Sequence, residues 1–170
     1  MKMKIKFLFL LLTSLFSTLT FAQNEKEYRE EFTLKIPVDT VQFYQQEVPK
    51  SKYFVKEGVL QIFPGENIFI ETETDGKNIT SMKVVKENLI PTKTIEIKFY
   101  QITEGKKHEQ MMLEVKNPFN KELDYDAMMY IVGHNNWIKT SIIPIKPKLM
   151  NFEMWNDVII TLVLNNWRIQ

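Results

Sequence analysis

The sequence predicts an all-β protein whose folded part is an antiparallel β-sandwich, preceded by a cleaved signal peptide. Three observations predict this fold class. Short apolar stretches recur about every 8–15 residues between turn residues, the clearest stretch alternates apolar and polar side chains, and no amphipathic helix of three turns can be drawn. The sequence contains neither an internal repeat nor a Gly/Ser linker, so we expect one domain.

The first 22 residues have the three parts of a secretory signal peptide. Three lysines are the only charges before Glu25, an apolar run follows over 7–19, and small residues precede a cut after Ala22. The apolar run is shorter than the about 20 residues that a membrane-spanning helix needs. We therefore expect an exported protein, periplasmic or extracellular, with no transmembrane anchor after signal removal; an uncleaved N-terminal anchor is the alternative.

Removal of the signal peptide leaves 148 residues with 19 basic and 21 acidic side chains, a net charge near −2. A nearly neutral chain with mixed signs is not typical of proteins that bind nucleic acid or anionic membranes. The absence of Cys excludes disulfides, thiol redox chemistry and Cys-ligated zinc, and a domain of this length can fold without disulfides. We divide the chain into a signal peptide over 1–22, an N-terminal extension over 23–57 that packs on the sandwich, and the sandwich itself over 58–170.

Glycine and proline mark the turns between the first strands. The pattern predicts strands over 31–36, 59–63, 67–73, 79–85 and 94–102. Two segments between them, Pro64-Gly65-Glu66 and Asp75-Gly76, have the residue types that turns require. In the fifth strand, Ile95, Ile97 and Phe99 share one face and polar residues share the other, as a half-buried sheet requires.

The second half of the chain continues this pattern. It predicts strands over 110–116, 123–132 and 137–145 and a long last strand over 158–169. Gly133 begins a hairpin turn, and Pro144 ends the strand that follows, because proline cannot donate to a β-ladder. Residues 148–157 are expected to be irregular or to form a single helical turn.

Most of the chain after Val48 is similar to a group of small secreted proteins of Gram-negative bacteria. The matching segments are 60–66, 111–119, 123–129, 139–144 and 162–169, together with Trp155. Members often carry a Cys before the proline that corresponds to Pro144, and this chain has Ile143 there. The resemblance implies an immunoglobulin-like sandwich and export, and it brings no known activity.

No motif for catalysis or metal binding is convincing. The segment from Glu71 to Gly76 resembles the start of a calcium loop, but Met82 stands at the twelfth position, where a bidentate carboxylate is needed. The two histidines have no partner at ligand spacing. Asp124 and Asp126 share a strand face without a marked partner across a cleft. We therefore predict a protein without catalytic activity, cofactor or resident metal.

Seven methionines follow the signal peptide, and thioethers suit Cu(I). Adjacent strand residues point to opposite faces, so Met111 and Met112 cannot hold one ion together. Only cross-strand pairs with Met128 or Met129 remain, and these require the two strands to be neighbours. Core packing by flexible apolar side chains is the competing interpretation, and we predict no copper site.

Three tryptophans, Trp137, Trp155 and Trp167, raise the alternative of a carbohydrate-binding protein, because sugar faces stack on exposed aromatic rings. Trp155 lies in a segment that mixes aromatic residues with amides. Aromatic side chains buried beneath loops are the competing interpretation.

The last strand is apolar on both faces, so we expect its second face to be covered. One face carries Val158, Ile160, Leu162 and Leu164. The other carries Ile159, Thr161 and Val163. We hypothesise that the N-terminal extension covers this second face through Phe32, Leu34, Phe43 and Tyr44. A partner subunit is the alternative, which would make an interaction surface of Ile159, Thr161, Val163 and Trp155.

Together these observations predict an exported, non-catalytic binding or structural module of the cell envelope. Its expected partner is a protein or another envelope component, and not nucleic acid. A carbohydrate-binding accessory protein is the first alternative, and a periplasmic protein that binds copper through methionine is the second.

Overall fold

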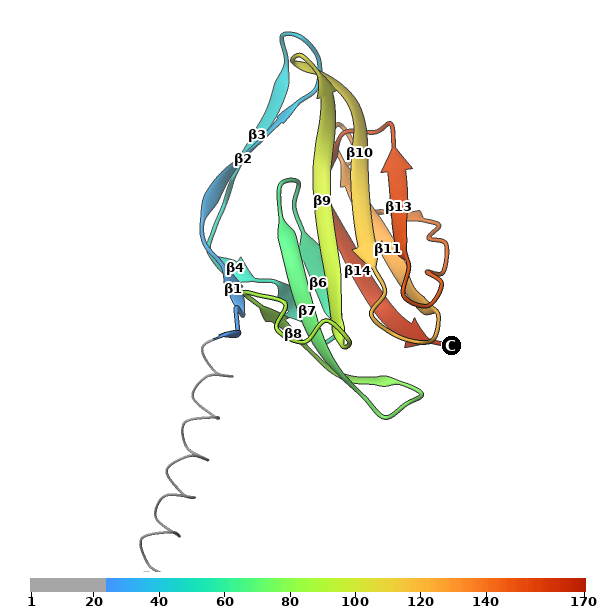
Figure 1. The fold of residues 1–170 in the computed structure, drawn as a ribbon. Helices are drawn as coiled ribbons and strands as arrows, with labels where there is room; N and C mark the ends of the chain where they lie inside the picture. The colour runs from blue at the N-terminus through green and yellow to red at the C-terminus, as the bar shows by residue number, and fades with distance from the viewer. Residues whose placement is uncertain (1–23) are drawn as a thin grey trace, which may run out of the picture.

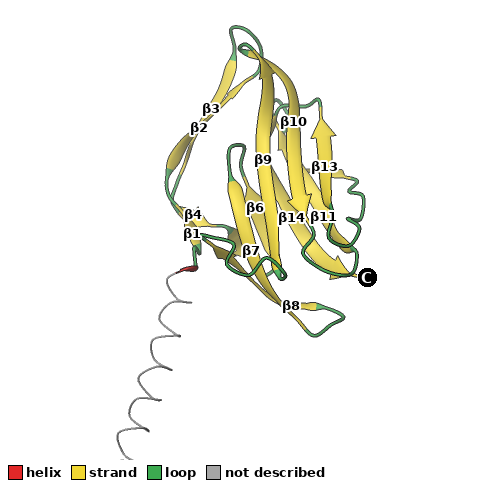
Figure 2. Cartoon of the chain, in the orientation of Figure 1, coloured by secondary structure: helices red, strands yellow, loops and turns green. Residues whose placement is uncertain are grey.

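The computed structural model describes residues 24–170, and the predicted signal peptide lies outside this range. Within it the chain is all-β, and every strand pair is antiparallel. Two five-stranded sheets pack face to face, and two short two-stranded sheets lie beside them (Figures 1 and 2). The predicted all-β, two-sheet architecture is therefore confirmed.

Strand order defines the two large sheets. The first sheet contains, in order, β13 (Met150–Trp155), β10 (Lys107–Lys116), β9 (Thr94–Glu104), β7 (Asn67–Thr74) and β8 (Ile79–Val85). The second contains β12 (Ile138–Thr140), β11 (Leu123–Ile131), β14 (Ile159–Ile169), β6 (Val59–Ile62) and β5 (Phe54–Lys56). Strand β5 falls within the segment that we assigned to the N-terminal extension, and it pairs with β6 as an edge of the second sheet.

The main core lies between the two sheets and follows from side-chain alternation. On β9, Ile95, Ile97 and Phe99 are fully buried, as the period of two predicts. Strand β11 alternates in the same way between buried and partly exposed residues over its whole length. Interdigitation of the two inner faces fills the space between the sheets with apolar side chains.

The N-terminal residues form a hairpin that leans on the sandwich. Strands β1 (Tyr28–Arg29) and β4 (Ser51–Lys52) pair at its base, and β2 (Phe32–Pro37) pairs with β3 (Phe43–Val48) above them. The hairpin extends towards the turn between β9 and β10 (Figure 1). Near the end of β9, the Gln101 side-chain amide donates to the carbonyl oxygen of Pro37 at 2.7 Å. The buried face of the hairpin builds a second, smaller core of Leu34, Ile36, Val48, Phe63 and Ile160.

Two predicted elements are wrong between residues 137 and 157. The strand expected over 137–145 is only three residues long, because the chain leaves the second sheet after Thr140 and crosses to the first. Residues 150–155 then form β13, where we expected an irregular segment. The sequence pattern did not predict this strand because its polarity is inverted. Its exposed side chains are apolar, those of Met150, Phe152 and Met154, while Asn151 and Glu153 point inward.

A bulge in β14 changes which of its residues lie on each face of the strand. The pairing with β11 shifts between Ile159 and Thr161, so Ile160 has no partner. Because the extra residue reverses the alternation, Ile159 joins the main core and Ile160 joins the second core under the hairpin. The face that the N-terminal hairpin covers is therefore centred on Ile160.

Candidate functional site

A groove runs between strand β3 of the hairpin and the outer face of the second sheet. Its volume is about 420 Å³. Strands β3, β6, β11 and β14, the residue after β6, and the segment between β11 and β12 line it, with Gln46, Gln61, Phe63, Tyr130, Asn135, Trp137, Ile160 and Thr161. None of them carries a charge, whereas a quarter of the whole sequence is charged. The groove therefore combines aromatic, amide and aliphatic surface.

Two aromatic rings form one wall of this groove. Tyr130 points outward from β11, and Trp137 immediately precedes β12, the strand that pairs with β11. Their ring centroids lie 5.4 Å apart with the planes tilted by 49°. The Trp137 side chain is 42 % exposed, although an indole of this size is usually well buried. The pair offers an accessible aromatic surface at the groove.

Three amides surround this aromatic wall. The Tyr44 hydroxyl donates to the Gln46 Oε1 atom at 2.6 Å, which leaves the amide nitrogen of Gln46 available. The side-chain amides of Gln61 and Asn135 make no hydrogen bond to the part of the chain that the structure describes. Burial, and then the neighbouring Tyr130, raise the pKa of Tyr44, whose hydroxyl is occupied by this hydrogen bond to Gln46.

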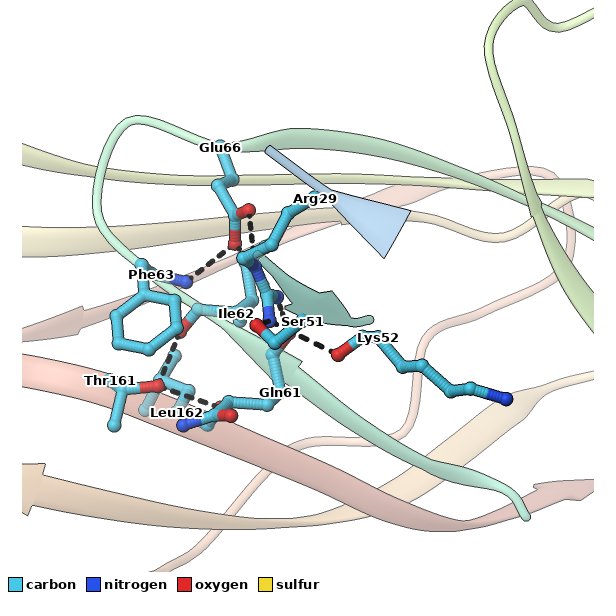
Figure 3. A network of polar contacts seen from close by, with 9 residues as sticks. All are labelled: Arg29, Ser51, Lys52, Gln61, Ile62, Phe63, Glu66, Thr161 and Leu162. Atoms are coloured by element: carbon cyan, nitrogen blue, oxygen red, sulfur yellow. Dashed lines mark hydrogen bonds and ion pairs between the residues drawn. The ribbon is translucent and has the colours of Figure 1, made fainter. Parts of the chain in front are cut away.

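The base of the groove is fixed by the bulged strand β14. Thr161 is buried, and its hydroxyl donates to the carbonyl oxygen of Ile62 at 2.9 Å (Figure 3). Beside it, Phe63 packs edge-on against Phe32 of the hairpin, with ring centroids 5.8 Å apart. These contacts hold β6, β14 and the hairpin in one arrangement around the groove.

A buried arginine fixes the backbone next to the groove. The Arg29 guanidinium, 2 % exposed, forms an ion pair with Glu66, with 2.9 Å between Nε and Oε1 (Figure 3). Its Nη2 atom donates to the carbonyl oxygen of Gln61 at 2.6 Å, and its Nη1 atom donates to the carbonyl oxygen of Lys52 at 3.2 Å. The backbone of Gln61 is thereby fixed while its side chain stays free to face the groove.

The residues that we predicted as an interaction surface fall in different places. Ile159 lies in the main core with no exposed surface, and Val163 is partly exposed on the outer face of β14. Trp155 is half-buried, and its indole nitrogen donates to the Thr140 hydroxyl at 3.0 Å. Thr161 is the one of the four that lines the groove.

The methionine pairs divide between interior and surface, as strand alternation predicts. Met111 and Met129 are buried, while Met112 and Met128 face outward. The cross-strand pairing that we considered does not occur, because β10 and β11 belong to different sheets. Met112 instead pairs in register with Met154.

The remaining candidate polar groups are engaged within the chain. Glu71, the first residue of the segment that resembles a calcium loop, is buried and forms an ion pair with Lys83 at 3.2 Å. The Arg168 guanidinium contacts both Asp124 and Asp126, at 2.5 and 3.1 Å. Hydrogen bonds from Asn166 and then from Arg168 lower the pKa of Asp126, which does not suit it to act as a general acid.

The two histidines lie in different parts of the fold, one in a strand and one in a turn. His108 lies in β10, where Nδ1 is 2.8 Å from the Gln101 amide nitrogen and Nε2 is 3.0 Å from the carbonyl oxygen of Asn156. His134 is exposed in the turn after β11. Across residues 24–170, no group of three or more His, Asp or Glu side chains is arranged to hold a metal ion.

Sequence reasoning missed most of the groove. It noted Trp137 and Thr161 separately, but it assigned no strand to residues 43–48 and so gave no position to Gln46. The turn that precedes Trp137 contains Asn135, and an aromatic residue next to an amide-rich turn was the available signal. The pairing of β2 with β3 could not be read from a local pattern, because β3 has only one buried residue.

Comparison with protein-family models, curated proteins and solved structures gives no match for this chain. Across residues 24–170, no helix has the length and apolar character that a membrane span requires.

Proposed function

We propose that this protein is an exported, non-catalytic binding module of the cell envelope, and that the groove between the hairpin and the second sheet is its binding site. The observation that carries the proposal is the exposed Trp137 ring, which stands beside Tyr130 among amides with free hydrogen-bonding groups. Ligand sites typically combine apolar and aromatic walls with a few well-placed polar groups.

The composition of the groove supports binding in preference to catalysis. General acid–base and nucleophilic mechanisms need a carboxyl, imidazole, amine or activated hydroxyl group near the substrate. The groove is lined by amides, apolar side chains and Tyr130, and the Thr161 hydroxyl is engaged by a backbone carbonyl.

The architecture supports an immunoglobulin-like scaffold. Two antiparallel sheets enclose one core, and the chain passes from one sheet to the other between β12 and β13. Sandwiches of this kind bind ligands on loops and faces while the core remains constant. The basic, apolar and small-residue order of the first 22 residues supports export.

The proposal can be tested with the exported protein immobilised on a resin. Solubilised envelope material containing both protein and polysaccharide is passed over wild type and over Trp137→Ala. We expect a component that wild type retains and that Trp137→Ala releases, because the substitution removes the exposed ring. Phe152→Ala is the matched control, since Phe152 is also an exposed aromatic residue but lies on the first sheet. Equal retention by all three proteins would contradict a binding role for the groove.

A further inference from the structure

We infer that the groove binds a neutral carbohydrate, with the apolar face of a sugar ring stacked on Trp137 and Tyr130. This inference rests on the proposed binding function and adds the chemical class of the ligand. It follows from three properties of the groove: its aromatic surface, its amides and its lack of charge.

The aromatic surface fits the face of a pyranose ring. The C–H groups on one face of a sugar are apolar, and they pack on the electron-rich face of an indole or phenol. Trp137 is exposed enough to be covered by a ligand, and Tyr130 extends the surface at 5.4 Å. The ring planes are tilted by 49° to each other and both rings line the groove, so a sugar placed there can contact both.

The amides fit the hydroxyl groups around that ring. Every sugar hydroxyl both donates and accepts, and a side-chain amide also does both. Gln61 and Asn135 have donor and acceptor atoms without partners among the described residues, and Gln46 has a free donor nitrogen. These three residues come from β6, the turn before Trp137, and β3, so they surround a ligand placed on the aromatic wall.

The absence of charge defines the kind of carbohydrate. No Lys, Arg, Asp or Glu lines the groove. An acidic sugar would lose hydration without gaining a compensating cation, which is unfavourable. The groove therefore suits neutral sugars and disfavours uronic acids and sugar phosphates.

The groove is held in place before a ligand arrives. Arg29 fixes the Gln61 backbone through its carbonyl oxygen, and Thr161 ties β14 to β6 (Figure 3). A site that is already ordered loses less conformational entropy when it binds. A proline-rich peptide is another ligand that docks on aromatic grooves, but it offers few donors for three amides, so the groove favours the sugar.

The test is isothermal titration calorimetry of the exported protein with neutral tetrasaccharides. Cellotetraose, xylotetraose, mannotetraose, maltotetraose and chitotetraose are titrated, and tetragalacturonate serves as the acidic comparison. We expect at least one neutral sugar to bind with a dissociation constant between about 10 µM and 10 mM, and the acidic sugar not to bind. Trp137→Ala should weaken binding at least about 10-fold, as for a central aromatic anchor, and Gln61→Ala by a smaller factor. Phe152→Ala should leave the affinity unchanged.

Three results would overturn the inference. The first is that no neutral sugar binds at 10 mM, and the second is that binding is equal in wild type and Trp137→Ala. The third is a preference for the acidic sugar. Loss of sugar binding together with retention of an envelope protein that depends on Trp137 would reject the carbohydrate while keeping the proposed binding function. Retention that does not depend on Trp137 would reject both.

Discussion

Arg29 and Glu66 form a two-pronged ion pair inside the protein, with 2.9 Å between Nε and Oε1 and 3.3 Å between Nη2 and Oε2. Glu66 also accepts the backbone N–H of Phe63 at 2.8 Å. The guanidinium lies between the rings of Tyr53 and Phe63, at 4.6 and 5.0 Å from their centroids. One buried cation thus joins the base of the N-terminal hairpin to the turn that follows β6, next to the candidate groove.

Replacing Arg29 with Ala should lower the free energy of unfolding by about 3–5 kcal/mol, because the substitution leaves Glu66 as a nearly buried carboxylate without its partner. Arg29→Lys should give an intermediate loss, since a lysine ammonium cannot make the two parallel hydrogen bonds of the guanidinium. Urea denaturation followed by tryptophan fluorescence measures both values.

Lys50→Ala is the control for the Arg29 variants. Lys50 forms an ion pair with Glu30 in which both side chains are more than half exposed, so its loss should change the free energy of unfolding by less than about 0.5 kcal/mol. Equal effects of Arg29→Ala and Lys50→Ala would show that the buried pair does not hold the hairpin base in place.

Tyr125→Phe should raise the free energy of unfolding at pH 7 by about 1 kcal/mol. Tyr125 is 2 % exposed, and its hydroxyl has no hydrogen-bond partner among the described residues. Removing an unpartnered buried hydroxyl removes a desolvation penalty, and the packing of the ring on Trp167, at 4.8 Å, is retained.

The advantage of Tyr125→Phe should grow above about pH 10, the ordinary pKa of tyrosine. Burial raises the pKa of Tyr125 far above that value, so the unfolded chain ionises there while the folded protein does not. The contribution of a raised pKa is complete below pH 10 and is lost as the pH rises, so wild type loses more stability than the variant. Tyr100→Phe is the control, because it removes a hydrogen bond to Glu114 and should give no gain at pH 7. No difference between Tyr125→Phe and wild type at pH 7 and at pH 11 would contradict the prediction.

The strands that the sequence predicted well are those in which apolar residues are buried and polar residues are exposed in strict alternation. On β9, the alternation around Ile97 corresponds to one buried and one outer face. Strand β13 does not follow this rule. Phe152 is exposed and Asn151 points inward, so the positions of its apolar residues did not indicate its buried face. The bulge at Ile160 likewise depends on pairing with a distant strand.

The groove was less accessible to sequence reasoning than the fold. Its lining residues come from positions between 46 and 161, and only the pairing of distant strands brings them together. Trp137 and Thr161 were noted separately, but the amides were not, because Gln and Asn on a strand or turn are ordinary surface residues. The Arg29–Glu66 pair was also missed. Arg and Glu are usually exposed, and a local sequence pattern does not show when such a pair is buried.

Phe152→Lys should reduce self-association of the protein at high concentration. The outer edge of β8 is bridged by the N-terminal residues, and the edge strands β5 and β12 have three residues each and carry a lysine. Strand β13 has six residues, no lysine and three exposed apolar side chains, those of Met150, Phe152 and Met154. An exposed apolar edge strand offers unpaired backbone N–H and C=O groups to another chain, so we expect association through β13.

Sedimentation velocity over a range of concentrations measures this association. Leu89→Lys is the control, because it makes the same change of charge at an exposed apolar residue outside the strands. We expect Phe152→Lys to shift the wild-type distribution towards monomer and Leu89→Lys to leave it unchanged. A wild-type protein that is monomeric at every concentration would contradict the prediction.

Intact-mass analysis of the protein from its host should show Gln23 as the first residue, in its open or cyclised form. The reason is the small residue at position 22 after a basic start and an apolar run, which is the order that signal peptidase recognises. A mature protein that retains Met1 would contradict both cleavage and the exported location.

The final prediction concerns the packing of the hairpin on the bulged strand. Leu34 and Ile36 point from β2 into the second core, where Ile160 is the buried residue contributed by β14. Leu34→Ala should lower the free energy of unfolding by about 2–5 kcal/mol, because it opens a cavity between the hairpin and the sandwich. Lys35→Ala, on the exposed face of the same strand, should cost less than about 0.5 kcal/mol.

A double-mutant cycle between Leu34→Ala and Ile160→Ala then tests the contact itself. Residues that share one cluster couple by about 0.5–3 kcal/mol, whereas residues in separate clusters are nearly additive. We expect coupling for this pair and additivity for Leu34→Ala with Val115→Ala, since Val115 belongs to the main core. Additivity in both cycles would mean that the hairpin does not rest on Ile160. In that case the apolar outer surface of β14 would need another cover, and a partner subunit would become the better explanation for it.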